Sequence, residues 1–179
     1  CEKYEKVKSS GNGLADLFAE REELLLGAYK KPDKEPEVSV KKIGIPFTML
    51  TYEFYPFWDA FFSELGFEVV LSDKTNKKII NDGLGLVVAE TCFPMKVVLG
   101  HVQNLLDKQV DYIFIPRIRD MPCKDNKIEG VRTGSYPCPF VQGMSTMVKA
   151  SMNIDEDMLI DPLINFSFKE YLKENQLRK

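Results

Sequence analysis

The sequence predicts an α/β fold of the Rossmann-like, doubly wound kind, with a mainly parallel sheet and helices on both of its faces. Short apolar runs of strand length alternate with segments whose apolar residues recur at every third or fourth position. Strands that are joined by helical crossovers form a parallel sheet with helices packed on its faces. The chain has 179 residues, 44% of them hydrophobic and 28% charged, which is enough for one substantial core.

The first 40 residues precede this alternating pattern and differ from it. The stretch "LADLFAEREELLLGAY" (14–29) predicts an amphipathic helix, because its large apolar residues lie close to helical spacing. The stretch "KKPDKEPEVSVKK" (30–42) has two prolines and dense alternating charge, which is typical of a linker. We therefore expect a helix and linker at 1–40 and a Rossmann-like domain at 41–179. Because the chain begins at Cys1 and not at a methionine, we expect it to be a fragment of a larger multidomain protein.

Strands and helices alternate regularly as far as Pro116. Four apolar runs predict strands: "KIGIPF" (42–47), "FEVVLS" (67–72), "LGLVVA" (84–89) and "DYIFIP" (111–116). The segments between them predict helices over 53–65, 74–82 and 94–107. Gly66 follows the first of these helices, at the position where a left-handed residue commonly ends a helix.

The pattern loosens after Pro116. The segment "RIRDMPCKDNKIEGVRTGSYPCPF" (117–140) is rich in proline and predicts a long loop, and long loops in compact domains are usually functional or disordered. A helix over 142–152 and a last strand over 158–165 are predicted to follow. A capping box at Ser167 favours a terminal helix.

Three cysteines are predicted to lie at one edge of the sheet. Cys92 comes three residues after the third predicted strand, whereas Cys123 and Cys138 follow the fourth, and ligands favour the crevice at the carboxyl ends of parallel strands. Cys92 also precedes a helix, whose free NH groups and dipole favour a thiolate over a thiol. Cys138 lies between two prolines that hold the local backbone extended. This pattern suits a metal or cluster site, or a reactive thiol.

A structural interpretation of the cysteines stays open beside this one. Cysteine is among the most often buried residues, and isolated cysteines fill cores more often than they bind metals. Spacing alone decides little, because the chain has no CxxC motif. The single histidine, His101, lies about two turns into a predicted helix and is assigned to packing or to the surface, not to a metal.

Composition and missing motifs exclude several classes of function. A net charge of -3 without clusters of basic and aromatic residues argues against nucleic acid as a partner. No run of about 18 apolar residues predicts a membrane span, and no signal pattern opens the chain, so we expect a soluble, cytoplasmic protein with no membrane partner. The common nucleotide-binding motifs, the GxSxG elbow and the HExxH motif are all absent.

Three long stretches between Ile43 and Met152 carry a family resemblance. They are "KKIGIPFTMLTYEFYPFWDAFFSELGFEVVLSDKTNKKI", "ETCFPMKVVLGHVQNLLDKQVDYIFIPRI" and "YPCPFVQGMSTMVKASM". They closely resemble the DUF2229 family of CoA-substrate-specific enzyme activase-related proteins, which are kin to the D-component subunits of 2-hydroxyacyl-CoA dehydratases. The opening "CEKYEK" and its "LADLF" helix resemble the junction that follows the ATP-binding activase domains in large fused members.

The resemblance implies a Rossmann-like module that contributes cysteines to a 4Fe-4S iron-sulfur cluster. In the dehydratases, such a cluster receives an electron from an ATP-driven activase and passes it to a 2-hydroxyacyl-CoA for radical dehydration. By position, Cys92 in "ETCFPMK" and Cys138 in "YPCPF" match the family's cysteines. Some relatives have a cysteine directly after the fourth strand, where this chain has Arg117, and Cys123 is the candidate to substitute for it. Because ATPase motifs are absent, the resemblance implies no ATPase activity for this segment.

Three functional hypotheses follow from the sequence and the resemblance. The first is an iron-sulfur redox module with Cys92, Cys138 and Cys123 as ligands, which takes part in electron transfer to an acyl-CoA beside neighbouring activase and dehydratase-like domains. Such a segment would not be an active enzyme alone, and in air we expect it to lack the cluster. The second is a structural or interaction domain of a large fused protein with no bound cluster. The third is a zinc site that uses the three cysteines and a water or His101.

Overall fold

The computed structural model describes residues 15–28, 40–122 and 134–166 and confirms the α/β fold class. Its main sheet has four strands in the order β2-β1-β3-β6, and all neighbours are parallel. The strands are β1 (Lys42–Ile45), β2 (Glu68–Leu71), β3 (Tyr112–Phe114) and β6 (Leu159–Ile160). The predicted strands at 42–47, 67–72 and 111–116 are thus confirmed.

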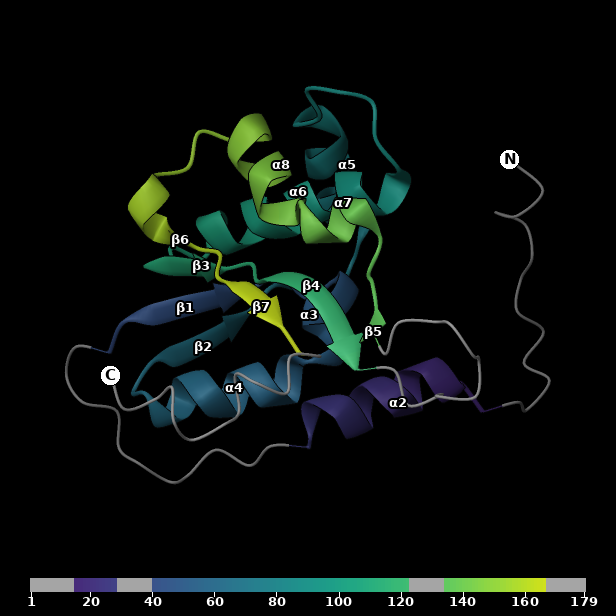
Figure 1. The fold of residues 1–179 in the computed structure, drawn as a ribbon, viewed down its shortest axis with the longest axis vertical. Coiled ribbons are helices and arrows are strands. Elements are labelled where there is room, and N and C mark those ends of the chain that lie inside the picture. The colour runs from purple at the N-terminus through teal and green to yellow at the C-terminus, as the bar shows by residue number, and fades with distance from the viewer. Residues whose placement is uncertain (1–14, 29–39, 123–133, 167–179) are drawn as a thin grey trace.

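Helices cover both faces of this sheet, as Figure 1 shows. One face carries α4 (Tyr55–Glu64), which follows the short helix α3 (Met49–Glu53). The other face carries α6 (Phe93–Asp107) and α8 (Met144–Ser151), with α5 (Lys77–Gly85) packed against α6. Two separate buried cores result, one beneath each helical layer.

Side chains of β3 and of the residue that follows it, Ile115, alternate between these two cores. Ile113 and Ile115 are buried in the core beneath α6 and α8, whereas Phe114 is buried in the core beneath α4. Ile43 and Ile45 on β1 join the α4 core. This period of two is what a strand buried on both faces requires, and it explains why the strands read as continuous apolar runs.

The helix predicted over 53–65 is present as α4, and it ends where its glycine predicts. Gly66 has a φ of 86°, its NH donates to the carbonyl of Ser63 at 3.1 Å, and the next NH, of Phe67, reaches the carbonyl of Phe62 at 3.0 Å. A residue without Cβ adopts this left-handed geometry at little cost. The turn directs the chain from α4 straight into β2.

Two glycines allow α5 and α6 to touch through their backbones. A Cβ added to Gly100 would lie 1.8 Å from the carbonyl oxygen of Ile79, and one added to Gly83 would lie 2.1 Å from the carbonyl oxygen of Lys96. Real side chains never approach a backbone atom so closely, so each position accepts only glycine at this spacing. The two helices therefore form one closely packed pair.

The third strand predicted at 84–89 is wrong. Helix α5 continues through Gly83 to Gly85, and residues 86–92 form an irregular connection to α6. The helix must extend this far because Gly83 makes the backbone contact with α6. Val87 and Val88 then line a pocket and do not pair with the sheet, whose fourth strand is β6. A short apolar run cannot by its periodicity alone be told from other partly buried segments.

The long loop predicted over 117–140 is wrong in its first part. Strand β4 (Arg117–Pro122) pairs in parallel with β7 (Leu163–Asn165) and antiparallel with β5 (Gly134–Ser135). These three strands form a second sheet in the order β5-β4-β7. Residues 123–133 lie outside the described part of the chain. The predicted helix over 142–152 is present as α7 (Pro139–Gln142) followed by α8. The predicted last strand is divided between β6 and β7.

The predicted N-terminal helix is present as α2 (Leu17–Leu26), which Asp16 caps by accepting two backbone NH groups. None of its residues is buried. Arg21 attaches it to the rest of the domain, because the guanidinium lies 2.6 Å from a carboxylate oxygen of Glu53 and 5.4 Å from the ring centre of Tyr52. Residues 29–39, which hold most of the predicted linker, and the predicted capping box at Ser167 lie outside the described residues.

Candidate functional site

Cys92 is the N-cap residue of α6. Its carbonyl accepts the backbone NH of Met95 at 3.0 Å and that of Lys96 at 3.3 Å. Pro94 fits the first turn of the helix because an NH at that position would have no partner within the helix. The thiol is exposed and makes no capping hydrogen bond. The helix therefore holds the backbone of Cys92, while the sulfur is available to an outside group.

The direction of α6 places Cys92 at the carboxyl edge of the main sheet. The helix ends at Asp107, five residues before β3 begins at Tyr112, so its last turn lies near the amino edge of the sheet. A helix of 15 residues is about 22 Å long, so its first turn lies near the opposite edge. Cys92 thus reaches the expected edge although the strand predicted before it is absent.

Cys138 has the same local structure at the start of α7. Its carbonyl accepts the NH groups of Val141 at 2.9 Å and Gln142 at 3.1 Å, and Pro139 occupies the first turn. The side-chain amide of Gln142 also donates to the carbonyl of Pro137 at 2.9 Å, which ties the residues before the cysteine to the helix. The thiol of Cys138 is exposed and makes no capping hydrogen bond.

The two cysteines begin helices on the same side of the main sheet. Figure 1 shows α6, α7 and α8 together in the layer opposite α4, and α8 contacts both α6 and α7. Within residues 15–28, 40–122 and 134–166, no three histidine, cysteine, aspartate or glutamate side chains form a group that could hold a metal ion. Cys123, the third predicted ligand, lies outside the described residues.

Arg117, the residue directly after the strand predicted at 111–116, takes a structural role. It is the first residue of β4, and its Nε donates to the carbonyl of Asp161 at 3.0 Å. Its backbone NH donates to the carbonyl of Pro162 at 2.9 Å. These bonds attach β4 to the turn between β6 and β7, so Arg117 aligns the second sheet with the first.

His101 is fully buried and bridges two hydroxyl groups. Its Nδ1 lies 2.8 Å from Ser72 Oγ, and its Nε2 lies 2.9 Å from Thr75 Oγ1. Ser72 Oγ also accepts the NH of Phe47 at 2.7 Å. Histidine therefore connects α6 to the loops that leave β1 and β2, which agrees with the packing role predicted for it.

This network indicates that His101 is neutral and carries its ring proton on Nε2. Because Ser72 Oγ accepts from Phe47, its own proton is free to point at Nδ1, which leaves the ring proton on Nε2 to be donated to Thr75. Burial lowers the pKa of His101 to about 4, and the nearby Asp73 opposes this shift only in part. Both ring nitrogens are engaged, so the ring has no free nitrogen for the zinc site considered above.

The comparisons with known proteins decide the family. The family model described as CoA enzyme activase uncharacterised domain (DUF2229) matches residues 42–179. The chain belongs to this family. For the DUF2229 chain, comparisons with curated proteins and with solved structures found no match. Among the described residues of this DUF2229 chain, no helix is both long enough and apolar enough to cross a membrane.

Exposed aromatic side chains flank both cysteines of the DUF2229 domain. Phe93 is 55% exposed beside Cys92, and Tyr136 and Phe140 are 56% and 44% exposed around Cys138. Sequence reasoning did not single out these residues. The signal was present in the quoted motifs, where an aromatic residue lies within two positions of each cysteine. Each thiol therefore has at least one exposed aromatic side chain close to it in the sequence.

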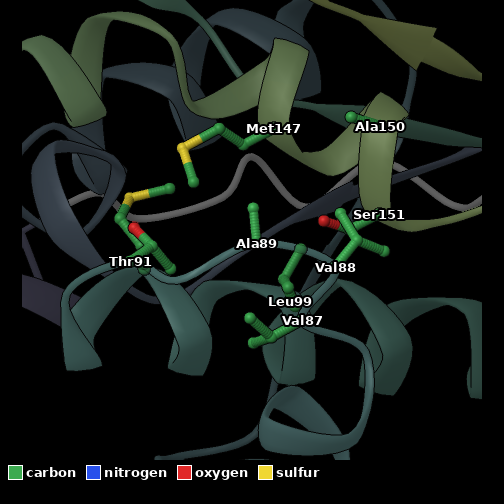
Figure 2. Close-up of a pocket in the computed structure, with 9 residues that line it drawn as sticks. Val87, Val88, Ala89, Thr91, Leu99, Met147, Ala150 and Ser151 are labelled. Carbon is green, nitrogen blue, oxygen red and sulfur yellow. The ribbon is translucent and has the colours of Figure 1, made fainter.

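An apolar pocket of about 100 Å³ lies behind the connection that leads to Cys92. Figure 2 shows its lining, which comes from the connection, from α6 and from α8. We call it the α6–α8 pocket; it is lined by Val87, Val88, Ala89, Thr91, Met95, Leu99, Met147, Ala150 and Ser151. Sequence reasoning missed this pocket because it assigned 84–89 to a buried strand.

Proposed function

We propose that this DUF2229 domain is an iron-sulfur redox module of a 2-hydroxyacyl-CoA dehydratase-related system. In this proposal Cys92 and Cys138, together with Cys123, supply thiolates to a 4Fe-4S cluster. When bound, the cluster would supply one electron to an acyl-CoA, in cooperation with neighbouring activase and dehydratase-like domains. The observation that carries the proposal is the pair of exposed thiols, each on the N-cap residue of a helix and each without a capping hydrogen bond.

The chemistry of these two cysteines fits a cluster better than it fits core packing. Cluster ligands are thiolates, and a ligand must present its sulfur at the surface of the site. Core cysteines are buried, whereas both of these are exposed. The described residues provide two of the four thiolates that a cluster of this kind uses, so in this proposal the site needs Cys123 and a further ligand from a neighbouring domain.

The local structure around each thiol supports the same role. Both cysteines have extended backbone geometry, with ψ values of 151° and 138°, and both are held by two hydrogen bonds to their carbonyl oxygens. A ligand whose backbone is fixed in advance loses little entropy on binding. The neighbouring Phe93 and Phe140 would exclude water from the sulfurs, and solvent access is one of the properties that set a cluster's potential.

The test is anaerobic reconstitution of the chain with iron and sulfide. Iron and acid-labile sulfide are measured together with the absorption spectrum for the wild type and for Cys92→Ser and Cys138→Ser. Cys1→Ser is the matched control, because it makes the same chemical change at a cysteine outside the proposed ligand set. We expect a broad charge-transfer band in the wild type and in Cys1→Ser, and its loss in the other two variants.

Circular dichroism shows whether a lost cluster reflects a lost fold. Exposed thiols contribute little to the core, so both serine variants should keep the wild-type melting temperature. A cluster that survives in both variants, or that depends equally on Cys1, would contradict the ligand assignment. If no sample binds iron, even when the chain carries its neighbouring domains, the redox proposal fails.

A second candidate function is an interaction domain without a cluster, and the surface of α2 and α4 favours it. Phe18 on α2 is 86% exposed, and Phe57 and Phe61 on α4 are 51% and 48% exposed. Apolar residues gathered on neighbouring helices are typical of surfaces that dock other domains. This candidate predicts a colourless protein whose serine variants all behave as the wild type in the reconstitution.

A further inference from the structure

The α6–α8 pocket has a size that suits a small organic molecule. Its volume is about 100 Å³. An apolar protein cavity of about 150 Å³ holds benzene, which has six carbon atoms. By proportion the α6–α8 pocket holds roughly four non-hydrogen atoms, and its open side, where Val88 and Ala89 are exposed, leaves room for a fifth. That is more than one water molecule and much less than a cofactor.

The lining of the pocket selects for uncharged ligands. No charged side chain lines it. The nearest charged neighbours in sequence are Glu90, between Ala89 and Thr91, and Lys96, which follows Met95. These two side chains pair with each other, with Lys96 Nζ 2.7 Å from a carboxylate oxygen of Glu90. A charged ligand would lose its hydration without gaining a free counter-charge, so the lining disfavours it.

One end of the pocket carries an unsatisfied hydroxyl. Thr91 Oγ1 is buried and has no hydrogen-bond partner among the described residues. Figure 2 shows the side chains of Thr91 and Met147 extending into the same part of the pocket. Unpaired buried hydroxyls are uncommon and call for an explanation. A methionine side chain is unbranched and flexible, so it can move aside and uncover the hydroxyl for a ligand.

We propose that the α6–α8 pocket binds a compact, uncharged aliphatic molecule of four or five non-hydrogen atoms that carries one hydrogen-bonding oxygen. The alkyl part occupies the space between Ala89, Leu99 and Ala150, and the oxygen pairs with the hydroxyl of Thr91. The site uses no cysteine, so it does not depend on the proposed redox function. It adjoins that site in the sequence, because Thr91 directly precedes Cys92.

Methionine methyl groups report directly on occupancy of the pocket. The full chain is labelled with ¹³C at its methionine methyl groups and titrated with isobutanol, with propionate as a charged molecule of the same number of non-hydrogen atoms, and with xenon as an apolar probe that lacks oxygen. Met95 and Met147 line the pocket, whereas Met121 lies in β4 and serves as the internal reference. We expect saturable shifts of Met95 and Met147 with isobutanol, and at least tenfold weaker binding of propionate.

Two variants separate the hydroxyl from the cavity. Thr91→Val keeps the shape and removes the oxygen, so isobutanol should bind roughly three- to tenfold more weakly while xenon binds as before. Ala89→Leu fills the space, because Figure 2 shows the methyl group of Ala89 directed into the middle of the pocket, and should abolish the shifts with both probes. Thr146→Val, an exposed site on α8, is the matched control and should bind like the wild type.

The titration overturns the proposal in three cases. The first is a set of shifts that grow linearly with concentration and affect Met121 as much as Met147. The second is undiminished binding in Ala89→Leu. The third is equal affinity of wild type and Thr91→Val for isobutanol, which removes the assigned role of the hydroxyl. Methyl spectra of each variant without ligand show whether the fold is intact, so a folding defect is recognised separately.

Discussion

Replacing Gly100 by alanine should destabilise the domain, because it forces apart two helices whose backbones are in contact. The new Cβ would lie 1.8 Å from the carbonyl oxygen of Ile79 and 2.8 Å from its carbonyl carbon. Ordinary van der Waals contact begins near 3.4 Å, so α5 and α6 would have to separate locally by about 1.6 Å. A helical carbonyl is held by its own hydrogen bond and cannot rotate away as a side chain can.

The size of the effect follows from two opposing contributions. A gap of 0.5–1 Å already forfeits about a quarter to a half of the dispersion energy at a contact, and overpacking a core costs about 1–3 kcal/mol or more. Alanine recovers about 1 kcal/mol because it favours a helix more than glycine does. Since the required separation exceeds 1 Å and the clashing atoms belong to the backbone, we expect a cost at the upper end of this range and a net loss of about 2 kcal/mol. The melting temperature should fall by roughly 4–8 °C.

Urea unfolding followed by tryptophan fluorescence measures this loss. Trp58 is the single tryptophan and is buried in the core beneath α4, so its emission reports on unfolding of the whole domain. The matched control is Gly85→Ala, at the end of α5, where an added Cβ meets nothing within 4 Å. We expect that variant to stay within about 0.5 kcal/mol of the wild type.

Equal stabilities of Gly100→Ala and Gly85→Ala would refute the reasoning. A second check uses Gly83→Ala, whose Cβ would meet the carbonyl oxygen of Lys96 at 2.1 Å. Both glycines lie in one crossing, so once the helices have separated for the first substitution the second should cost little more. The double variant should therefore lose less stability than the sum of the single variants.

Three further predictions concern the stability of the domain. As the pH falls from about 6.5 towards 4, the free energy of unfolding of the wild type should decrease by up to about 3 kcal/mol more than that of His101→Gln. The reason is that burial lowers the pKa of His101 in the folded protein to about 4, so that in this range only the unfolded chain takes up the proton. Urea titrations at each pH test this, and identical pH profiles of the two proteins would contradict it. Ser72→Ala should cost about 1–3 kcal/mol in chemical denaturation because it leaves the buried NH of Phe47 unpaired. Ser135→Ala, at an exposed position in β5, should cost less than about 0.5 kcal/mol, and equal losses would count against the network. Gly66→Ala should cost about 1 kcal/mol in thermal unfolding because its φ is 86°, and an unchanged melting temperature would show that the turn relaxes.

The elements that local patterns could predict are those whose buried apolar residues recur at a regular spacing along the chain. Strands β1, β2 and β3 are short apolar runs between helical stripes, and α6 has a proline in its first turn and an apolar face. Gly66 could be predicted because the end of a helix imposes a local backbone geometry that favours glycine. The cysteine at the start of α6 could be placed for the same reason, since helix starts leave local signals.

The elements that could not be predicted depend on contacts between distant residues. Gly83 and Gly85 resemble residues at the boundary of a strand, because glycine commonly ends regular elements. Gly83 is nevertheless helical, and the backbone of Lys96, 13 residues later, lies against it. Strand β4 looks like a loop, because its pairing partner β7 begins at Leu163, far along the chain. The pocket beside Thr91 exists only because 86–92 leaves the sheet, which no local pattern shows.

The glycine contact between α5 and α6 also determines how the protein can tolerate sequence change. The connection 86–92 is anchored at both ends by this crossing, and it carries Cys92 at its last position. When a library of variants is selected for a function of that thiol, substitutions of Gly83 and Gly100 should therefore be removed as strongly as substitutions of the cysteine itself. Neither glycine would touch the reacting group. They would not tolerate substitution because the crossing of α5 and α6, where neither helix has a side chain, sets the position of the thiol.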